Sequence, residues 1–210
     1  MNIFKEMNQT MSIKIDARGL ACPKPVINTK RELDKLEEGV VVTIVDNETA
    51  KENVLKLAKS LSCEANIVDE KENFISIEIR KGKNILDKQN IVDNKESELD
   101  NTCIFISSDK MGLGNDELGK VLIKGFIYTL TESKPYPKYV LLVNGGVKLS
   151  AENEETIENL KILENMGVEV LSCGTCLDYY NLKDKLQVGT VTNMYTIVET
   201  LKNASNTISI

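Results

Sequence analysis

The sequence contains no histidine. Histidine is the side chain whose ordinary pKa lies near neutral pH, so its absence removes the most common general base. A Ser-His or Cys-His pair and a His metal triad are also excluded. Any reactive group in this chain must therefore be activated in another way.

Long apolar runs and an excess of basic residues are missing as well. The longest apolar stretch, residues 121–130, is interrupted by Lys124 and Gly125 and is far shorter than the roughly 20 residues that span a bilayer. The first ten residues have no apolar signal segment. Lys plus Arg number 26 against 32 Asp plus Glu, a net charge of -6, which is the wrong sign for binding nucleic acid. We therefore expect a cytoplasmic protein that binds neither membrane nor nucleic acid.

The chain has five cysteines, an odd number at irregular spacing. A disulfide scaffold of a secreted protein is usually short and has an even number. Hydrophobic residues make up 41% and charged residues 28%, values close to those of globular proteins. We expect a folded protein with free thiols in a reducing compartment.

Residues 82–100 separate two parts of different pattern. This segment is dense in Lys, Asp, Asn and Glu, and its few aliphatic residues follow no helical or strand period. The remaining parts, residues 11–81 and 101–210, are each large enough for a small domain. We predict two domains joined by this linker.

The pattern of residues 11–81 predicts a β-α-β-α-β-β order, a two-layer sandwich with both helices on one face of the sheet. We expect Gly39 to end the first helix, which extends as far as Glu37. The expected elements are strand 12–17, the helix after Cys22, strand 40–45, helix 48–61, and strands 64–68 and 74–80.

Residues 101–210 alternate strands and helices, and their strands are continuously apolar, which indicates a parallel sheet with helices on both faces, a three-layer α/β domain. The expected elements are strand 103–107, helix 117–131, strand 139–143, helix 151–166, strand 168–171, a short helix after Cys176, a last helix with Val191, Met194, Val198 and Leu201, and an edge strand 207–210.

Cys22 lies in the most informative local motif, Cys-Pro-Lys-Pro. Proline is favoured in the first turn of a helix, so Cys22 should lie at or next to the N-cap. The positive end of the helix, with Arg18 and Lys24 nearby in sequence, favours the thiolate and can lower a cysteine pKa from about 8.5 to about 7. A buried structural cysteine is the alternative.

The stretch DARGLACPKP, residues 16–25, together with the predicted β-α-β-α-β-β order, resembles the TusA/SirA-like sulfur-carrier domain. The resemblance implies that Cys22 carries sulfur as a persulfide and passes it to another protein, and that Arg18, Gly19, Pro23, Lys24 and Pro25 shape its loop. Cys63 has no motif around it and is expected in the core.

A second thiol motif, Cys173-Gly174-Thr175-Cys176, follows directly on strand 168–171. In a parallel α/β sheet, ligands collect beyond the carboxyl ends of the strands, so both thiols should lie at that edge. One sulfur of such a pair can attack while the other resolves, and a following helix start would acidify the exposed one. A thiol-exchange site, a thioredoxin-like couple and a zinc site are the three interpretations. A structural zinc site needs four ligands, and the sequence has no histidine and no second Cys-x-x-Cys motif, so we expect no metal and no cofactor.

Two other strands should end at the same edge. Glycines there let backbone N–H groups approach an anion, and Lys110 could add charge, although the loops lack a complete nucleotide-binding motif. The loop residues expected around the thiol pair are Ser107, Ser108, Lys110, Met111, Gly112, Gly114, Asn144, Gly145, Gly146, Gly174 and Thr175.

The motifs SSDKMGLGNDELG, VNGGVKL and CGTC make residues 101–210 similar to a DsrE-like domain. The order of the two domains looks like that of YedF-type proteins, which are associated with selenium metabolism. The resemblance implies relay partners such as a cysteine desulfurase, and assembly of copies through the DsrE-like domain.

We therefore hypothesise a sulfurtransferase-like thiol carrier of sulfur or selenium, in which Cys22 holds a persulfide or perselenide and Cys173 or Cys176 exchanges it. The alternative is a redox-sensing or interaction protein that uses Cys173 and Cys176 as a dithiol-disulfide couple. The residues alone do not choose between sulfur and selenium, nor between the two thiols of the pair. A conventional transferase is disfavoured because the sequence supplies no general base.

Overall fold

The structure, a computed structural model, describes residues 12–82 and 99–210. These residues form two compact units, one before and one after the intervening segment. Most of the interval predicted as a linker, residues 83–98, lies outside the described residues. The strand that opens the second unit starts at Leu99, within that interval.

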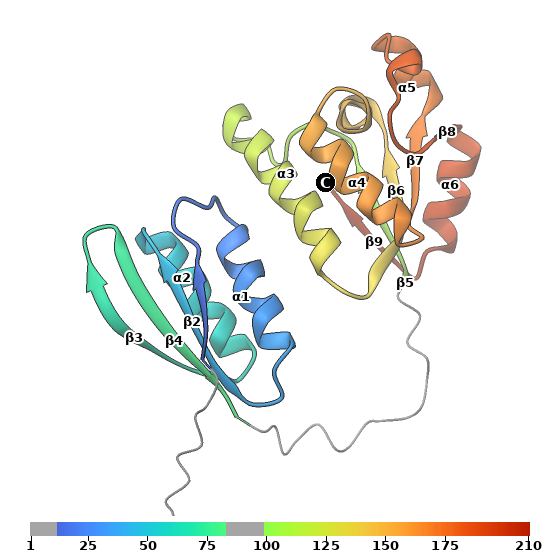
Figure 1. Cartoon of the computed structure of the whole chain (residues 1–210). Helices are drawn as coiled ribbons and strands as arrows, with labels where there is room; N and C mark the ends of the chain where they lie inside the picture. The colour runs from blue at the N-terminus through green and yellow to red at the C-terminus, as the bar shows by residue number, and fades with distance from the viewer. Residues whose placement is uncertain (1–11, 83–98) are drawn as a thin grey trace, which may run out of the picture. The chain divides into compact units, whose positions relative to one another are not determined.

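The first unit is a two-layer α/β sandwich, as the alternation of its sequence predicts (Figure 1). Its sheet has the order β1-β2-β4-β3, in which β1 and β2 are parallel and the other neighbours are antiparallel. Both helices cover one face of this sheet. The elements are β1 (Ser12–Asp16), α1 (Lys24–Asp34), β2 (Gly39–Val45), α2 (Glu48–Ser60), β3 (Glu64–Lys71) and β4 (Phe74–Lys81).

Local sequence explains where the two helices begin. Pro23 caps α1 and a second proline, Pro25, lies in its first turn, where no backbone N–H is needed. Asn47 caps α2, and its side-chain oxygen accepts a hydrogen bond from the Ala50 N–H at 2.9 Å. The prediction that Gly39 ends the first helix was wrong. The helix ends at Asp34, and Gly39 is the first residue of β2.

The core of the first unit lies between the sheet and the two helices. Leu33 of α1 and Val54 of α2 are fully buried, and they belong to one cluster with Val41, Ile77 and Ile79 of the sheet. Cys63 is partly buried and packs against this cluster. The two helices are thereby held on the sheet by apolar burial, so their N-termini lie at fixed positions.

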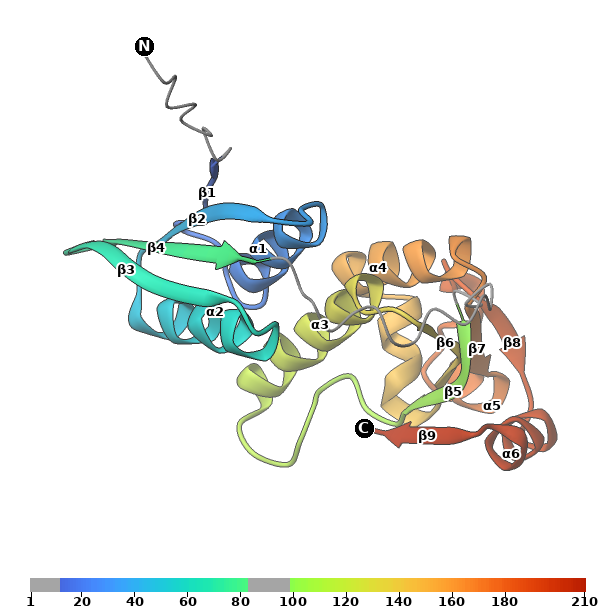
Figure 2. The ribbon, with the colours of Figure 1, turned by 90° about the horizontal axis from the view of Figure 1, so that it is seen from below.

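The second unit has a five-stranded sheet of order β8-β7-β6-β5-β9 in which every pair of neighbours is parallel. Figure 2 shows α3 and α4 on one face of this sheet and α6 on the other, the predicted three-layer arrangement. The elements are β5 (Leu99–Ile106), α3 (Asp116–Glu132), β6 (Tyr136–Leu142), the 3-10 helix η2 (Asn144–Ser150), α4 (Glu154–Asn165), β7 (Glu169–Cys173), α5 (Gly174–Tyr179), η3 (Lys183–Lys185), β8 (Thr190–Thr192), α6 (Met194–Asn203) and β9 (Asn206–Ser209).

Three details of the second unit differ from the sequence prediction. The short helix starts at Gly174, so Cys176 lies inside it rather than before it. Val191 belongs to β8 and not to the last helix. The helix expected from residue 151 starts at Glu154, because Asn153 caps it with its side chain and the preceding residues form η2. The terminal strand is confirmed as an edge strand, paired with β5.

The core of the second unit is built from the continuously apolar strands. Ile104 and Ile106 of β5 are buried with Leu141 and Leu142 of β6, and Leu160 of α4 packs against the same cluster. Among the described residues, no helix is long and apolar enough to cross a membrane.

Candidate functional site

Cys22 lies immediately before the cap of α1, and its side chain is exposed. The preceding chain turns at Gly19, which has a φ of 72° in the left-handed region that glycine adopts readily. The alternative of a buried structural cysteine is therefore wrong. The thiol is presented to solvent at the positive end of an 11-residue helix.

A pocket of about 210 Å3 opens beside Cys22. Its wall comes from the loop before α1, the start of α1 and the first two turns of α2. The lining residues are Leu20, Ala21, Cys22, Pro25, Val26, Asn47, Thr49, Ala50 and Asn53. The starts of two helices thus meet at this pocket, and both dipoles favour a negative charge there.

Asn53 supplies a side-chain donor to the thiol. Its amide Nδ2 lies 3.9 Å from the Sγ atom of Cys22, a distance at which an N–H can donate to sulfur. Asn53 is on the second turn of α2 and more than thirty positions away from Cys22 in sequence. Packing of α1 against α2 brings the two together.

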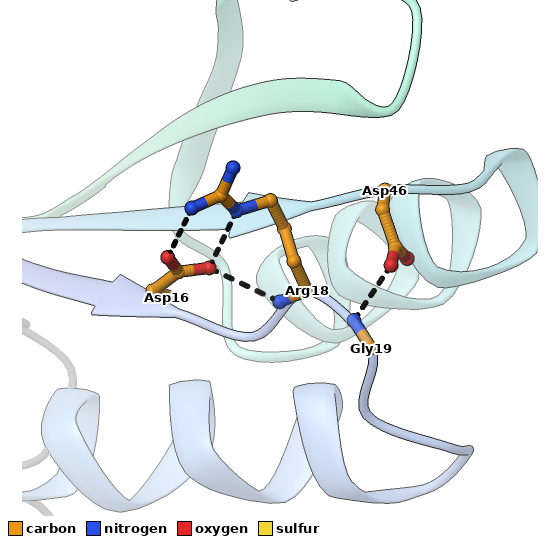
Figure 3. Close-up of polar contacts among 4 residues, drawn as sticks. All are labelled: Asp16, Arg18, Gly19 and Asp46. Carbon is orange, nitrogen blue, oxygen red and sulfur yellow. Dashed lines mark hydrogen bonds and ion pairs between the residues drawn. The ribbon is translucent and has the colours of Figure 1, made fainter.

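Arg18 does not serve the thiol in the way that its place in the sequence suggested. Its guanidinium makes two hydrogen bonds to the carboxylate of Asp16, of 2.9 and 2.6 Å, as Figure 3 shows. It also lies over the ring of Phe74, 5.6 Å from the centroid. Because a carboxylate already neutralises it, Arg18 anchors the loop and brings no free positive charge to Cys22.

A second carboxylate, Asp46 at the end of β2, fixes the turn itself. It accepts a hydrogen bond from the Gly19 N–H at 2.6 Å (Figure 3). That bond, and a second one from Asn47, lower the pKa of Asp46. The hydrogen bonds from Arg18 lower the pKa of Asp16 from 3.8 to about 2. Both groups are therefore ionised at neutral pH and hold the loop that precedes the thiol.

The other predicted support residues of the first site lie around the start of α1. Pro23 is the cap, Lys24 is the first helical residue and is exposed, and Pro25 is buried and lines the pocket. The Pro25 carbonyl accepts a hydrogen bond from the buried Thr29 hydroxyl at 2.8 Å. These residues determine where α1 begins and hence where Cys22 lies.

In the second unit, Cys173 and Cys176 differ in exposure. Cys173 is the last residue of β7 and only 3% of it is exposed, whereas Cys176 is half-buried in the first turn of α5. The prediction that the pair lies at the carboxyl edge of the sheet agrees with this geometry, but only Cys176 is accessible there. Cys173 is also the N-cap of α5, so the two cysteines lie at the start of the same short helix.

The expectation that a helix start acidifies the exposed thiol was wrong. Burial raises the pKa of Cys176 above its usual value of 9.0, and the hydrogen bond with Cys173 adds to the rise. The Asn144 N–H, which donates to the Sγ atom of Cys176 at 3.1 Å, opposes the rise. Cys176 lies in the first turn of the six-residue α5 rather than at its cap.

The predicted loop after β6 does meet the thiol pair. Asn144 has a φ of 47°, and its side-chain oxygen accepts a hydrogen bond from the Tyr180 hydroxyl at 3.0 Å. Lys148 lies over the Tyr180 ring, 4.9 Å from the centroid, and 3.7 Å from a carboxylate oxygen of Asp109. Residues that follow β5, β6 and β7 therefore form one polar cluster around Cys176.

Close packing explains one of the two glycines of this loop. A Cβ on Gly146 would lie 2.4 Å from the Ile106 carbonyl oxygen, which no side chain tolerates. A Cβ on Gly145 would lie 3.5 Å from the Asp109 nitrogen, an ordinary contact. The role of Gly146 is thus to let the loop pass over the end of β5.

The remaining predicted loop residues make other contacts. Lys110 forms an ion pair with Asp116 at the start of α3, so its charge is already compensated. Ser107 bonds to the Ile210 carbonyl oxygen through both its N–H and its hydroxyl, at 2.8 and 3.0 Å. The others make local contacts or face solvent. Ser108 accepts from the Lys110 N–H, the Met111 N–H donates to the Gly119 carbonyl oxygen, Gly112, Gly114 and Thr175 are exposed, and Gly174 packs on Val191.

Several site residues were missed by sequence reasoning. At the first site these are Asn53 and Asp46, and at the second Tyr180, Lys148 and Asp109. Each acts on a residue far away in the sequence. Asp109 and Lys148 lie in the quoted motifs SSDKMGLGNDELG and VNGGVKL, but their pairing with each other could not be inferred from those motifs. Within residues 12–82 and 99–210, no cluster of three or more His, Cys, Asp or Glu side chains could hold a metal ion.

Comparison with known proteins gives matches that each cover part of this chain. A proposed sulfur carrier protein of Methanocaldococcus jannaschii is 35% identical over 69 residues, which are 32% of this chain and 92% of that protein. A crystal structure of a SirA-like protein from Desulfitobacterium hafniense is 34% identical and has a TM-score of 0.32, covering 34% of this chain and 99% of that one.

Two further solved structures each cover 52% of this chain. The ychN protein of Escherichia coli is 14% identical over 98% of its length, with a TM-score of 0.37. A conserved protein of unknown function from Bacteroides thetaiotaomicron is 16% identical over 95% of its length, with a TM-score of 0.40.

The family described as sulfurtransferase TusA matches residues 13–81, the segment that contains Cys22, its pocket and the anchored loop. Together with the relative that is 35% identical and covered over 92% of its length, this match shows that the chain belongs to the TusA family through its first unit.

Proposed function

We propose that this protein is a sulfur carrier in which the Cys22 thiol holds a sulfur atom as a persulfide and hands it to another thiol. A selenium atom could be held in the same way as a perselenide. Membership of the TusA family and the proposed sulfur carrier among its relatives support this role. Other proteins of a sulfur relay, such as a cysteine desulfurase, are the partners that this role requires.

The observation that carries the proposal is the position of Cys22. Its exposed sulfur lies at a pocket of about 210 Å3, where two helices begin and where the Asn53 amide points at Sγ. A persulfide is more acidic than a thiol and is anionic at neutral pH, so an environment that favours negative charge stabilises it. Exposure lets a partner thiolate reach the outer sulfur.

Loading tests the proposal. The full chain is incubated with a cysteine desulfurase and cysteine, and sulfur adducts are mapped by mass spectrometry after alkylation. We expect an added sulfur atom on Cys22, and none on that position in Cys22→Ser, while Cys63→Ser serves as the matched control and loads normally. A wild-type chain without an adduct on Cys22 would end the proposal. Parallel loading with a selenide donor compares the two elements.

A second function, redox sensing by the thiol pair, is favoured by one observation. Cys173 ends β7 and Cys176 lies in the first turn of α5, the close spacing that a dithiol needs to form a disulfide. A reduction potential in the range of cytosolic couples, about -270 to -200 mV, without any loading by sulfur or selenium, would favour this alternative.

A further inference from the structure

The two thiols of the second unit are arranged for different tasks. Cys173 is 3% exposed at the end of β7, so its sulfur cannot reach a group carried by another molecule. Cys176 is half-buried and its sulfur faces the polar cluster that follows β5, β6 and β7. An incoming group must therefore bind to Cys176 first. Cys173 is the N-cap of α5 and Cys176 lies in the first turn of that helix, so Cys173 stays close to whatever Cys176 has accepted.

Cys176 also has a donor that suits an anionic sulfur. The Asn144 N–H points at its Sγ from 3.1 Å, and the Tyr180 hydroxyl holds the Asn144 side chain at 3.0 Å. Lys148 lies over the Tyr180 ring and is paired with Asp109, so it helps to hold the ring that positions Asn144. The hydrogen bond from Asn144 thereby replaces part of the hydration that an anionic thiolate or persulfide on the half-buried Cys176 loses. Cys173, by contrast, is packed in the apolar core of the second unit.

We propose that the second unit is a persulfide-reducing site, in which Cys176 accepts the outer sulfur of a persulfide and Cys173 releases it as sulfide. This proposal deepens the proposed function, and it rests on that function only for the identity of the natural donor, the Cys22 persulfide. The same two steps with a perselenide would release hydroselenide.

The first step is an exchange at sulfur. The Cys176 thiolate attacks the outer sulfur of a donor persulfide R–S–SH, so that a new S–S bond forms at Cys176, the S–S bond of the donor breaks, and R–S⁻ leaves. The product is Cys176–S–SH. Atoms and charge balance without any oxidant or reductant.

The second step reduces the transferred atom. Cys173 gives its proton to the departed R–S⁻, and its thiolate attacks the inner sulfur of Cys176–S–SH. A Cys173–Cys176 disulfide forms and HS⁻ leaves, so that the two thiols lose the two electrons that the outer sulfur gains. An external dithiol reductant of the thioredoxin class then returns the pair to thiols and restores the site.

Sulfide release from the full chain with Cys22→Ser tests this proposal. Glutathione persulfide is the donor, released sulfide is measured during a single turnover without reductant, and the thiol pair is mapped by mass spectrometry. We expect one sulfide and one Cys173–Cys176 disulfide per chain. With a dithiol reductant present, release should become catalytic. Because Cys22 is absent, the result does not depend on whether Cys22 is a carrier.

Variants of the pair separate the two roles. Cys173→Ser and, should that variant fold poorly, Cys173→Ala should retain a persulfide on Cys176 and release at least tenfold less sulfide. Cys176→Ser should do neither. A persulfide found on Cys173 in Cys176→Ser, or full sulfide release without Cys173, would overturn the proposal. The proposal that Cys22 carries sulfur would not be affected by that result, because loading of Cys22 in the wild type is measured in a separate experiment.

Tyr180 is a positioning residue in this scheme. Its role is tested by the pH dependence of Cys176 alkylation. Tyr180→Phe removes the hydroxyl that holds Asn144, so the N–H to Cys176 becomes less well directed and the thiolate is less favoured. We expect alkylation of Cys176 to slow by about two- to fivefold near neutral pH and its pH midpoint to rise. Tyr179→Phe, on a ring that is 80% exposed, is the control. Equal midpoints in the two variants would remove Tyr180 from the mechanism.

Discussion

At the scale of single residues, the Asn53 amide on the Cys22 sulfur invites the most direct test. An aspartate at position 53 keeps the size of the side chain but replaces an N–H donor by a carboxylate facing the thiolate. A like charge close to the sulfur disfavours the thiolate, which is the form that reacts with alkylating reagents. We expect Asn53→Asp to slow iodoacetamide alkylation of Cys22 at pH 7 by about three- to tenfold, and Asn53→Ala by less.

The control for this experiment is Asn66→Asp, an exposed position on β3 that does not line the pocket. It adds the same charge to the same domain and should leave the alkylation rate unchanged. If Asn66→Asp and Asn53→Asp slow the reaction equally, the effect comes from net charge, and the contact with Asn53 has no part in it.

The second residue-scale prediction concerns the anchor at Asp16. Its pKa is lowered to about 2 by the hydrogen bonds from Arg18. A carboxylate with a lowered folded-state pKa contributes stability above the ordinary value of 3.8, and loses this contribution as the pH falls through about 2. We expect Arg18→Ala to return the carboxyl resonance of Asp16 toward an ordinary titration. High salt should shrink the shift because the pair is exposed.

An Asp16 that titrates normally in the wild type would contradict the bidentate pair. NMR of the side-chain carboxyl carbon between pH 1 and pH 6 measures it directly. Asp69 forms a surface ion pair with Lys71, and its carboxyl signal can be compared with that of Asp16 in the same spectra.

At the scale of elements, the passage of η2 over the end of β5 depends on Gly146. An added methyl would lie 2.4 Å from the Ile106 carbonyl oxygen, so the loop must shift. We expect Gly146→Ala to lower the free energy of unfolding of the second unit by about 1–3 kcal/mol, and to slow persulfide exchange at Cys176 because Asn144 is displaced. Urea unfolding and Cys176 alkylation measure the two effects.

Gly114→Ala is the matched control for that change. Nothing lies within 4 Å of a Cβ at this position. The same substitution there should leave stability within about 0.5 kcal/mol of the wild type. A Gly146→Ala protein as stable as Gly114→Ala would show that the loop adapts without cost.

Most elements were predictable because their signals are local. The β-branched run of residues 40–45 and the two prolines around Lys24 specify a buried strand and a helix start by themselves. The start of α5 was placed too late because Cys173 caps it without any side-chain hydrogen bond. Gly39 was misplaced for a similar reason, since a glycine after a helical segment can as well open the next strand.

The cysteines of the two candidate sites could be predicted from the sequence, but the residues that contact them could not. Cys-Pro-x-Pro and Cys-x-x-Cys are contiguous motifs, so Cys22, Cys173 and Cys176 could be identified from the sequence alone. Asn53 and Tyr180 act through tertiary contacts that span more than thirty residues, and the carboxylates that neutralise Arg18 and Lys110 could not be assigned from sequence order.

At the scale of the whole molecule, residues 12–82 and 99–210 form two separate apolar cores. Each unit buries its own cluster, and the two clusters share no residue. We therefore expect two unfolding transitions in urea rather than one. Ile77→Ala in β4 and Leu160→Ala in α4 each empty a fully buried position and should each cost about 2–5 kcal/mol.

Each substitution should move one transition and leave the other in place. Differential scanning calorimetry or circular dichroism with the two variants in parallel measures this. A common shift of both transitions by either variant would mean that the two units unfold cooperatively.

Cys103 has a practical consequence for every thiol experiment above. Its side chain is fully buried, and burial raises its pKa to about 11. In native protein at neutral pH it should remain unmodified while alkylating reagents act on exposed sulfur, and it should react only after denaturation. Alkylation of Cys103 therefore serves as an internal control for folding. A label on the peptide that contains Cys103 comes from molecules in which the second unit had already unfolded.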